Sequence, residues 1–287
     1  MPALAGEPPS IATLRAGDDV DGVYACTRKD RLLARSGAPY LALELRDRGG
    51  ALAARAFRDA DVLAGRFDRG DLVRVQGRVE RFRDELQVDV RAIERAPAAD
   101  PGRFLPVAYR DLDELDGFLE HLAREVHDPE YRALLGDGAL RAQWRRAPGT
   151  RSGHHAYLGG LLEHTVAVAT LALETCQLHV RLNSDLLLTA ALVHDLGKTR
   201  EFSYGAEIGL TEEGRLLGHV VLGQRILDER SGGMGEARRL ALAHCVLTHH
   251  GADAAPGRRF GSPEALALYR LNALDASVKG ALEHGLP

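Results

Sequence analysis

Residues 185–198 have the sequence DLLLTAALVHDLGK, and this stretch decides the fold of the second half of the 287-residue chain. Almost no polar side chain interrupts it before His194 and Asp195. A helix that is apolar on all sides is normally buried at the centre of a domain. We therefore expect a central helix that carries an imidazole and a carboxylate at its end.

Helical spacing extends in both directions from this stretch. Apolar residues such as Leu112, Leu115 and Leu119 recur three or four positions apart, as on one face of a helix. Further helices are expected near 160–177, 185–196, 211–229, 236–248 and 262–280. Ser262 and Pro263 are a typical N-cap and first residue for the last helix. The sequence after about residue 111 therefore predicts an all-α domain.

The first hundred residues follow a different period. Leu41, Leu43 and Leu45 alternate with polar or small residues, as expected for strands with one buried face. Strands are expected near 20–27, 39–46, 51–57, 71–79 and 85–93, with a short helix near 59–67. Five strands with a helix between the third and fourth predict an OB-type β-barrel.

The two patterns together predict an α+β protein with two domains. The sequence APAADPG, at 96–102, is typical of a linker. We expect a flexible N-terminal tail at 1–16, a five-stranded OB-type barrel at 17–95, a linker at 96–110 and an all-α domain at 111–287.

Composition limits the class of protein. The chain is 45% hydrophobic and 27% charged, as in soluble globular proteins, and no apolar run reaches the roughly 18 residues of a membrane span. The N-terminus lacks the pattern of a secretory signal, and three scattered cysteines indicate reduced thiols. A net charge of −4 argues against non-specific DNA binding over the whole surface. We therefore expect a cytoplasmic protein without a membrane partner.

Ionisable side chains lie on the buried faces of several expected helices. His164 has Leu161 three positions before it and Val168 four positions after it, so its ring points into the core. The spacing of the neighbouring residues also places Asp275 and His219 on apolar faces. The neighbours concerned are Leu271 and Val278 for Asp275, and Leu216 and Ile226 for His219.

Metal binding explains this set of buried groups better than separate structural roles do. A single buried histidine is usually a hydrogen-bonded core residue, but four apolar helices that each direct an ionisable group inward are unusual. Buried carboxylates are costly unless they are paired or bind a metal. Imidazole and carboxylate ligands without thiolate suit Mn²⁺, Fe²⁺, Co²⁺, Ni²⁺ or Zn²⁺. Five other histidines are assigned structural or surface positions: His121, His127, His179, His244 and His284.

The order H…HD…H…HH…D resembles the HD-domain metal-dependent phosphohydrolases that can hold two metals. More specifically, SGHHAYLGGLLEHT (152–165), LLLTAALVHDLGK (186–198) and TEEGRLLGH (211–219) resemble the YhaM-type 3′→5′ exoribonucleases. GAPYLALELRDRGG (37–50) and GDLVRVQGRVERFRDELQVDV (70–90) are similar to the OB-fold segment of that family. The resemblance covers residues 17–280 with the order of the domains preserved.

The resemblance implies a site with two divalent metal ions. The first would be held by His164, His194, Asp195 and Asp275, and the second by His219, His249 and His250, with Asp195 bridging the two. Lys198 would contact the phosphate, and its place one helical turn after Asp195 suits that role. Asp195 and Lys198 are therefore the expected catalytic residues. Arg215 is a further phosphate candidate, and His154 and His155 are expected to line the site.

The barrel would hold single-stranded RNA, or single-stranded DNA, by base stacking and by charge along the backbone. Tyr40, Phe57 and Phe82 are the stacking candidates, and Arg28, Lys29 and Arg83 are the phosphate candidates. The third strand departs from the family, which usually has more aromatic residues there than Phe57 alone. HHG (249–251) is not followed by the GYP of the cyclic-dinucleotide phosphodiesterases, which argues against that related activity.

The predicted function is that of a metal-dependent 3′→5′ exoribonuclease that releases 5′-mononucleotides. Two alternatives remain open. An HD-domain nucleotidohydrolase or phosphodiesterase would act on free nucleotides and use the barrel for assembly only. A non-catalytic RNA-binding adaptor would have a degenerate site. The barrel argues against the first alternative, and the complete ligand set argues against the second.

Overall fold

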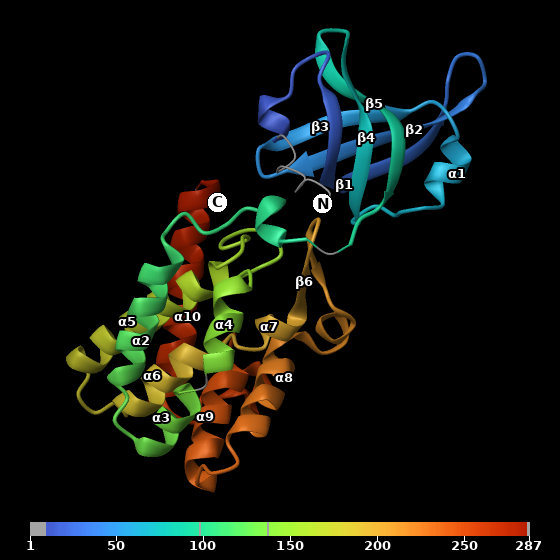
Figure 1. The fold of residues 1–287 in the computed structure, drawn as a ribbon. Coiled ribbons are helices and arrows are strands. Elements are labelled where there is room, and N and C mark those ends of the chain that lie inside the picture. Colours follow the sequence, from blue (N-terminus) through green and yellow to red (C-terminus); the bar gives the residue numbers. More distant parts are fainter. Residues whose placement is uncertain (1–9, 98, 137, 286–287) are drawn as a thin grey trace, which may run out of the picture. The chain divides into compact units, whose positions relative to one another are not determined.

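The computed structural model describes residues 10–97, 99–136 and 138–285. The chain divides into two compact units. The first comprises the residues up to Pro106 together with Tyr204–Ile208, and the second comprises Val107–Ser203 and the residues from Gly209 onward. The strands of the first unit are blue to green in Figure 1, and the helices of the second are green to red.

The first unit is a closed β-barrel of five strands in the order β1-β2-β3-β5-β4. β3 and β5 pair in parallel, and the other neighbours are antiparallel. The bounds are β1 Asp19–Leu33, β2 Pro39–Asp47, β3 Gly50–Ala56, α1 Ala60–Ala64, β4 Leu72–Phe82 and β5 Glu85–Arg95. The OB-type barrel predicted from the alternating pattern is confirmed, with the short helix between β3 and β4.

The barrel begins earlier than expected. A 3₁₀ helix, η1 (Ile11–Thr13), precedes β1, and Ile11 and Leu14 are buried in the barrel core. The backbone N–H of Ile11 donates to Asp47 Oδ2 over 2.7 Å. Residues 10–16 are therefore part of the barrel rather than of a flexible tail, because burial of two of their apolar side chains in the core stabilises this position. The rest of the expected tail, residues 1–9, lies outside the described residues.

The second unit is helical. Its helices are α2 Leu112–Arg124, α3 Pro129–Leu135, α4 Gly138–Arg146, α5 Gly160–Leu178, α6 Ser184–Val193, α7 Lys198–Glu201, α8 Glu212–Arg230, α9 Glu236–Thr248 and α10 Pro263–His284. Two short strands, β6 Phe202–Tyr204 and β7 Ile208–Leu210, pair with each other. Three further 3₁₀ turns are η2 Pro101–Arg103, η3 Ala252–Ala254 and η4 Pro256–Arg258. The sequence did not predict α3, α4 or the β6–β7 pair, because each is short.

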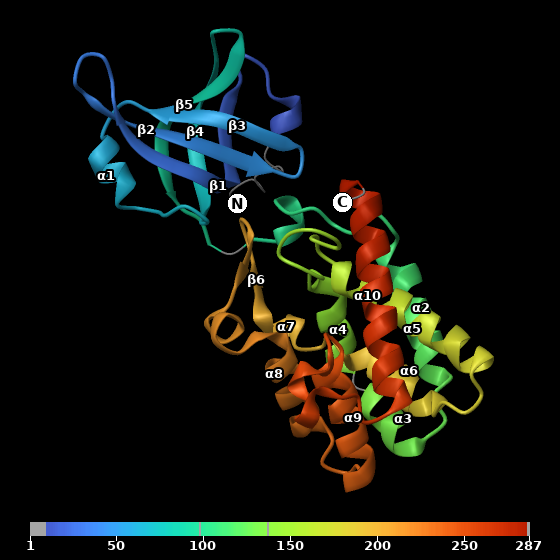
Figure 2. The ribbon, with the colours of Figure 1, turned by 180° about the vertical axis from the view of Figure 1, so that it is seen from behind.

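Helix α6 is the centre of this unit, as predicted. Every residue from Leu186 to Val193 is buried, and α6 packs against α2, α5, α9 and α10. The side chain of Asn183 caps its first turn by accepting from the N–H of Leu186. Helix α10 begins with the predicted cap, since Ser262 Oγ accepts from the N–H of Ala265. Figure 2 shows α10 running along α5, which positions residues of both helices beside the end of α6.

None of the helices in the described part of the chain is long and apolar enough to cross a membrane.

Candidate metal centre

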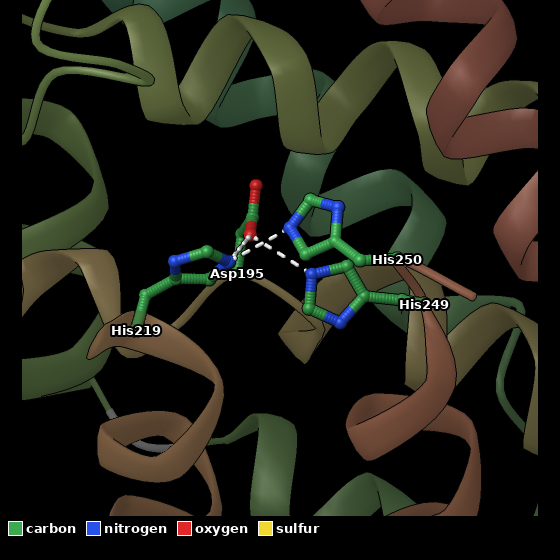
Figure 3. Close-up of side chains that lie close together, drawn as sticks. All are labelled: Asp195, His219, His249 and His250. Atoms are coloured by element: carbon green, nitrogen blue, oxygen red, sulfur yellow. Dashed lines mark hydrogen bonds and ion pairs between the residues drawn. The ribbon is translucent and has the colours of Figure 1, made fainter. Parts of the chain in front are cut away.

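Asp195 lies at the centre of a cluster of histidines, in the turn between α6 and α7. Its side chain is 1% exposed. Oδ2 lies 3.4 Å from Nε2 of His164 and 3.3 Å from Nε2 of His194. Oδ1 lies 3.5 Å from Nε2 of His219 and 3.4 Å from Nε2 of His249. Each carboxylate oxygen therefore faces two imidazole nitrogens, and Figure 3 shows the group around Oδ1.

The other ring nitrogen of these histidines has a hydrogen-bond acceptor. Nδ1 of His194 lies 2.8 Å from the carbonyl oxygen of Ala191, and Nδ1 of His249 lies 2.5 Å from that of Val246. A carbonyl oxygen can only accept, so both Nδ1 atoms carry the proton. In this tautomer the Nε2 atom of each ring presents a lone pair toward Asp195, as a metal ligand does.

Carboxylates play the same part for the remaining two histidines. Nδ1 of His164 lies 2.6 Å from Asp275 Oδ2, and Nδ1 of His219 lies 3.3 Å from Glu201 Oε1. A carboxylate that accepts from Nδ1–H fixes the orientation of the ring and makes Nε2 a better ligand. All four histidines are thus held with Nε2 directed at Asp195.

The residues present fit divalent cations. Among the described residues, Oδ1 of the buried Asp195 and Nε2 of His249 have no hydrogen-bond partner, and the partner of Asp195 Oδ2 is the ammonium of Lys198 at 2.7 Å. Buried polar atoms without partners are costly unless an ion satisfies them. The ligand atoms of Asp195, His219, His249 and His250 lie within 4.8 Å of one another, as do those of His164, His194 and Asp195. Both groups contain Asp195, so the arrangement can place one cation on each of its oxygens.

Electrostatics keep the charges of the cluster suited to metal binding. Burial alone would raise the pKa of Asp195, but Lys198 and the neighbouring histidines outweigh it and hold that pKa well below its usual value. Burial lowers the pKa of His194 to about 4, so its ring is neutral at pH 7. At pH 7 Asp195 is therefore an anion, and His194 is neutral with a lone pair on Nε2 that can bind a metal.

Lys198 lies where a phosphate contact was predicted. Its ammonium is 2.7 Å from Asp195 Oδ2, and its side chain is 10% exposed. The expected phosphate candidate Arg215 is exposed in the first turn of α8. Among the described residues Arg215 makes no ion pair with the cluster, whereas Lys198 pairs with Asp195. The phosphate contacts of both residues stay predictions.

Asp275 is placed differently from its neighbours in the predicted ligand set. Oδ2 lies 2.6 Å from Nδ1 of His164 and 3.1 Å from Nε2 of His155. Asp275 forms one possible ligand group with His155 and His164. His194 and Asp195 form a second group with His164, on the opposite side of the His164 ring. In this geometry Asp275 orients His164, and its role as a direct ligand stays a prediction.

The prediction that Val278 and Leu216 are buried beside Asp275 and His219 was wrong, although Asp275 and His219 themselves face the cluster as expected. Val278 is 51% exposed and Leu216 is 63% exposed. Asp275 lies at the edge of the buried face of α10, which is formed by Ala265, Leu268 and Asn272. The backbone of α8 leaves the helical conformation at Gly218, so Leu216 and His219 do not share a continuous face.

His155 belongs to the cluster, and His154 lies beside it. His155 is buried and has a left-handed backbone, with φ of 55°. Its Nδ1 lies 3.0 Å from the hydroxyl of Tyr157, which donates to Glu163 Oε2 over 2.6 Å. His154 is half-buried. Its pKa is lowered mainly by burial and secondly by the charge of His155. The sequence analysis expected both histidines to line the site without assigning their individual roles, and it missed Tyr157, Glu163 and Glu201.

The barrel carries an aromatic patch formed by Tyr40, Arg55, Phe57 and Phe82. The rings of Tyr40 and Phe57 stack with centroids 5.4 Å apart. The guanidinium of Arg55 lies 5.5 Å from the ring centre of Tyr40 and 5.8 Å from that of Phe82. Phe57 is 51% exposed and Phe82 is 49% exposed. The structure thus brings the three predicted stacking residues together and adds Arg55, which the sequence did not single out.

The predicted phosphate contacts of the barrel differ from one another. The prediction for Lys29 was wrong, because its ammonium donates to the carbonyl oxygens of Ala64, the last residue of α1, and of Phe67 in the segment that follows. Arg28 pairs with Asp30 over 2.5 Å. Arg83 lies over the ring of Phe82, 5.4 Å from its centre, and therefore borders the aromatic patch.

Comparison with known families agrees with this description. Residues 161–277 match the HD domain, and residues 25–96 match the OB-fold nucleic acid binding domain. Residues 121–185 also match a model described as a putative helicase, but the chain contains no Gly-x₄-Gly-Lys-Ser/Thr phosphate loop. The fold and the site define an HD-domain hydrolase joined to an OB-fold nucleic-acid-binding domain.

Curated relatives extend over nearly the whole chain. The chain is 28% identical over 282 residues to a protein of Shouchella clausii named 3′-5′ exoribonuclease YhaM, covering 92% of this chain and 85% of the relative. It is 28% identical over 285 residues to the protein of that name from Listeria monocytogenes, covering 93% and 88%. For the Bacillus pumilus protein the identity is 27% over 304 residues, covering 96% and 92%. Over nearly its whole length the chain is therefore similar to the curated 3′-5′ exoribonucleases named YhaM.

Proposed function

We propose that this protein is a metal-dependent 3′→5′ exoribonuclease that hydrolyses single-stranded RNA to 5′-mononucleotides. The observation that carries the proposal is the buried carboxylate of Asp195, which faces two histidine Nε2 atoms on each oxygen. The direction of degradation and the RNA substrate are proposed from the relatives described above, which are named 3′-5′ exoribonucleases.

The proposal includes two divalent ions, with Mn²⁺ or one of Fe²⁺, Co²⁺, Ni²⁺ and Zn²⁺ as candidates. His164, His194, Asp195 and Asp275 are the proposed residues of the first position, and His219, His249, His250 and Asp195 those of the second. Such a pair supplies an activated water and offsets charge on the phosphate. Asp195 provides the shared negative charge, and the buried histidines keep their Nε2 atoms fixed before substrate arrives.

Lys198 is the proposed phosphate-binding residue. Its ammonium lies beside Asp195, so a phosphate bound at the centre would have a positive charge within reach. A positive charge placed in a site that excludes water stabilises the negative charge that develops during hydrolysis. His154 and His155 border the same space, and His154 is the more exposed of the two.

The barrel, from residue 10 to residue 95, is the proposed RNA-binding domain, and the helical domain at 111–287 is the proposed hydrolase. The aromatic patch offers ring faces on which bases can stack, and Arg55 and Arg83 add positive charge beside them. A cytoplasmic location is part of the proposal, because Cys26, Cys176 and Cys245 are free thiols.

End-labelled RNA tests the activity. Purified protein with Mn²⁺ should shorten 5′-labelled single-stranded RNA one nucleotide at a time, and RNA with a blocked 3′ end should resist. Rapid internal cleavage of the blocked RNA would contradict the exonuclease. Hydrolysis of free nucleotides without action on RNA would favour the nucleotidohydrolase, and RNA binding without hydrolysis in any of the candidate metals would favour the adaptor.

A further inference from the structure

Glu201 accepts two hydrogen bonds from a single histidine of the metal centre. Its Oε1 lies 3.1 Å from the backbone nitrogen of His219 and 3.3 Å from Nδ1 of the His219 ring. The Glu201 side chain is 12% exposed, so little water competes for this oxygen. Both the main chain and the ring of His219 are therefore held by the same carboxylate.

A break in α8 makes the backbone bond possible. Gly218 has φ of 70° and ψ of 163°, a conformation that is open almost only to glycine. In a continuous helix the N–H of His219 would be used within the helix. Here it donates to Glu201 instead, so the irregular glycine presents His219 to the carboxylate.

Close contact between α7 and α8 fixes this arrangement. A Cβ added to Gly214 would lie 2.2 Å from the carbonyl oxygen of Glu201, and one added to Gly197 would lie 1.9 Å from that of His219. Neither position can therefore carry a side chain while the backbones keep this distance. Thr211 adds to the contact, because its N–H donates to the carbonyl oxygen of Glu201 over 2.9 Å.

From these contacts we infer that Glu201 is a positioning residue for His219, acting through the break at Gly218. The carboxylate holds the proton of the His219 ring on Nδ1, which leaves Nε2 to bind a cation together with His249 and His250. Nε2 of His219 lies 2.9 Å from Nε2 of His250 and 3.5 Å from Asp195 Oδ1, as this role requires. The inference rests on the proposed two-metal function and assigns Glu201 to the second position only.

Metal content and the tautomer of His219 test the inference separately from activity. The full chain would be prepared as the wild type, Glu201→Ala, Glu201→Gln and Gly218→Ala, with Glu213→Ala as the matched control. Glu213 is an exposed acid in the first turn of α8. Circular dichroism and thermal unfolding would show which variants fold. If Glu201→Ala does not fold, the nearly isosteric Glu201→Gln still allows the test.

Bound Mn²⁺ per chain, measured across a titration, should show the second position weakened by about 10- to 100-fold in Glu201→Ala and Gly218→Ala. Glu201→Gln should be intermediate, because its amide oxygen can still accept both bonds but carries no negative charge. The first position, with His164 and His194, should keep its affinity, and Glu213→Ala should match the wild type. Unchanged affinity at both positions in the Glu201 variants would overturn the inference.

Long-range ¹H–¹⁵N spectra of metal-free, histidine-labelled protein give the second readout, with His219→Ala to assign the signals. The wild type and Glu213→Ala should show the His219 proton on Nδ1, and Glu201→Ala should lose that preference. An unchanged His219 tautomer in Glu201→Ala would contradict the positioning role. If the wild type binds one metal only, the two-metal proposal fails, while these spectra still decide the role of Glu201.

Discussion

The ammonium of Lys198 lies 2.7 Å from Oδ2 of Asp195, the residue on which the histidine cluster converges. The two residues are three positions apart, across the turn that joins α6 to α7. The turn therefore places the proposed bridging carboxylate and the proposed phosphate-binding charge side by side.

Replacing Lys198 by methionine should slow RNA hydrolysis by about 100-fold or more, because a charge that stabilises the reacting phosphate is removed. Single-turnover assays at saturating RNA would measure the change. Arg200→Met is the matched control, since Arg200 is in the same short helix and pairs with Glu229 away from the cluster. Equal rates for Lys198→Met and the wild type would show that Lys198 serves only as a partner of Asp195.

Replacing Phe57 by alanine should weaken binding of single-stranded RNA by roughly 5- to 100-fold, the effect of losing one base–aromatic stack. Hydrolysis of a small phosphodiester such as bis(p-nitrophenyl) phosphate should not change, because the metal centre is not altered. Val62→Ala, an exposed apolar position on α1, is the control. Loss of activity on both substrates would indicate that Phe57 acts through the stability of the barrel.

Replacing Leu187 by alanine should lower the free energy of unfolding of the helical unit by about 2–5 kcal/mol. Leu187 is fully buried in α6, so the truncation leaves a cavity at the centre of the unit. Leu240→Ala should change stability by less than about 0.5 kcal/mol, because Leu240 is 60% exposed on α9. Denaturant unfolding of both variants would show whether α6 is the core helix, and similar losses would contradict it.

The parts of the structure that the sequence predicted are those with a strong period. The apolar run of α6 marked it as central, and the alternation of Leu41, Leu43 and Leu45 marked a strand with one buried face. The ordered histidines and aspartates identified the residues that gather around Asp195, because a buried ionisable group stands out on an apolar helix.

The sequence could not reveal the features that depend on a local irregularity or on tertiary contact. Glu201 was missed because its partner is a backbone N–H freed by the break at Gly218, which a regular helical period does not show. A glycine inside a helical pattern is nevertheless a signal for such a break. Lys29 was predicted to contact phosphate. Its partners are the carbonyl oxygens of Ala64 and Phe67, which are distant in the sequence and leave no trace in the residues around Lys29.

The most direct test of the two-metal account is the metal content and turnover of Asp195→Asn. The substitution keeps the shape of the side chain but removes the charge that lets a carboxylate bridge two cations. We expect at least one metal to be lost per chain and RNA hydrolysis to fall by orders of magnitude, because the proposed metal pair would supply the activated water. RNA affinity, measured on the same protein, should be nearly unchanged, since the aromatic patch lies in the barrel. Retention of both metals together with cleavage near the wild-type rate would contradict the account and leave the buried His194–Asp195 pair with a structural role.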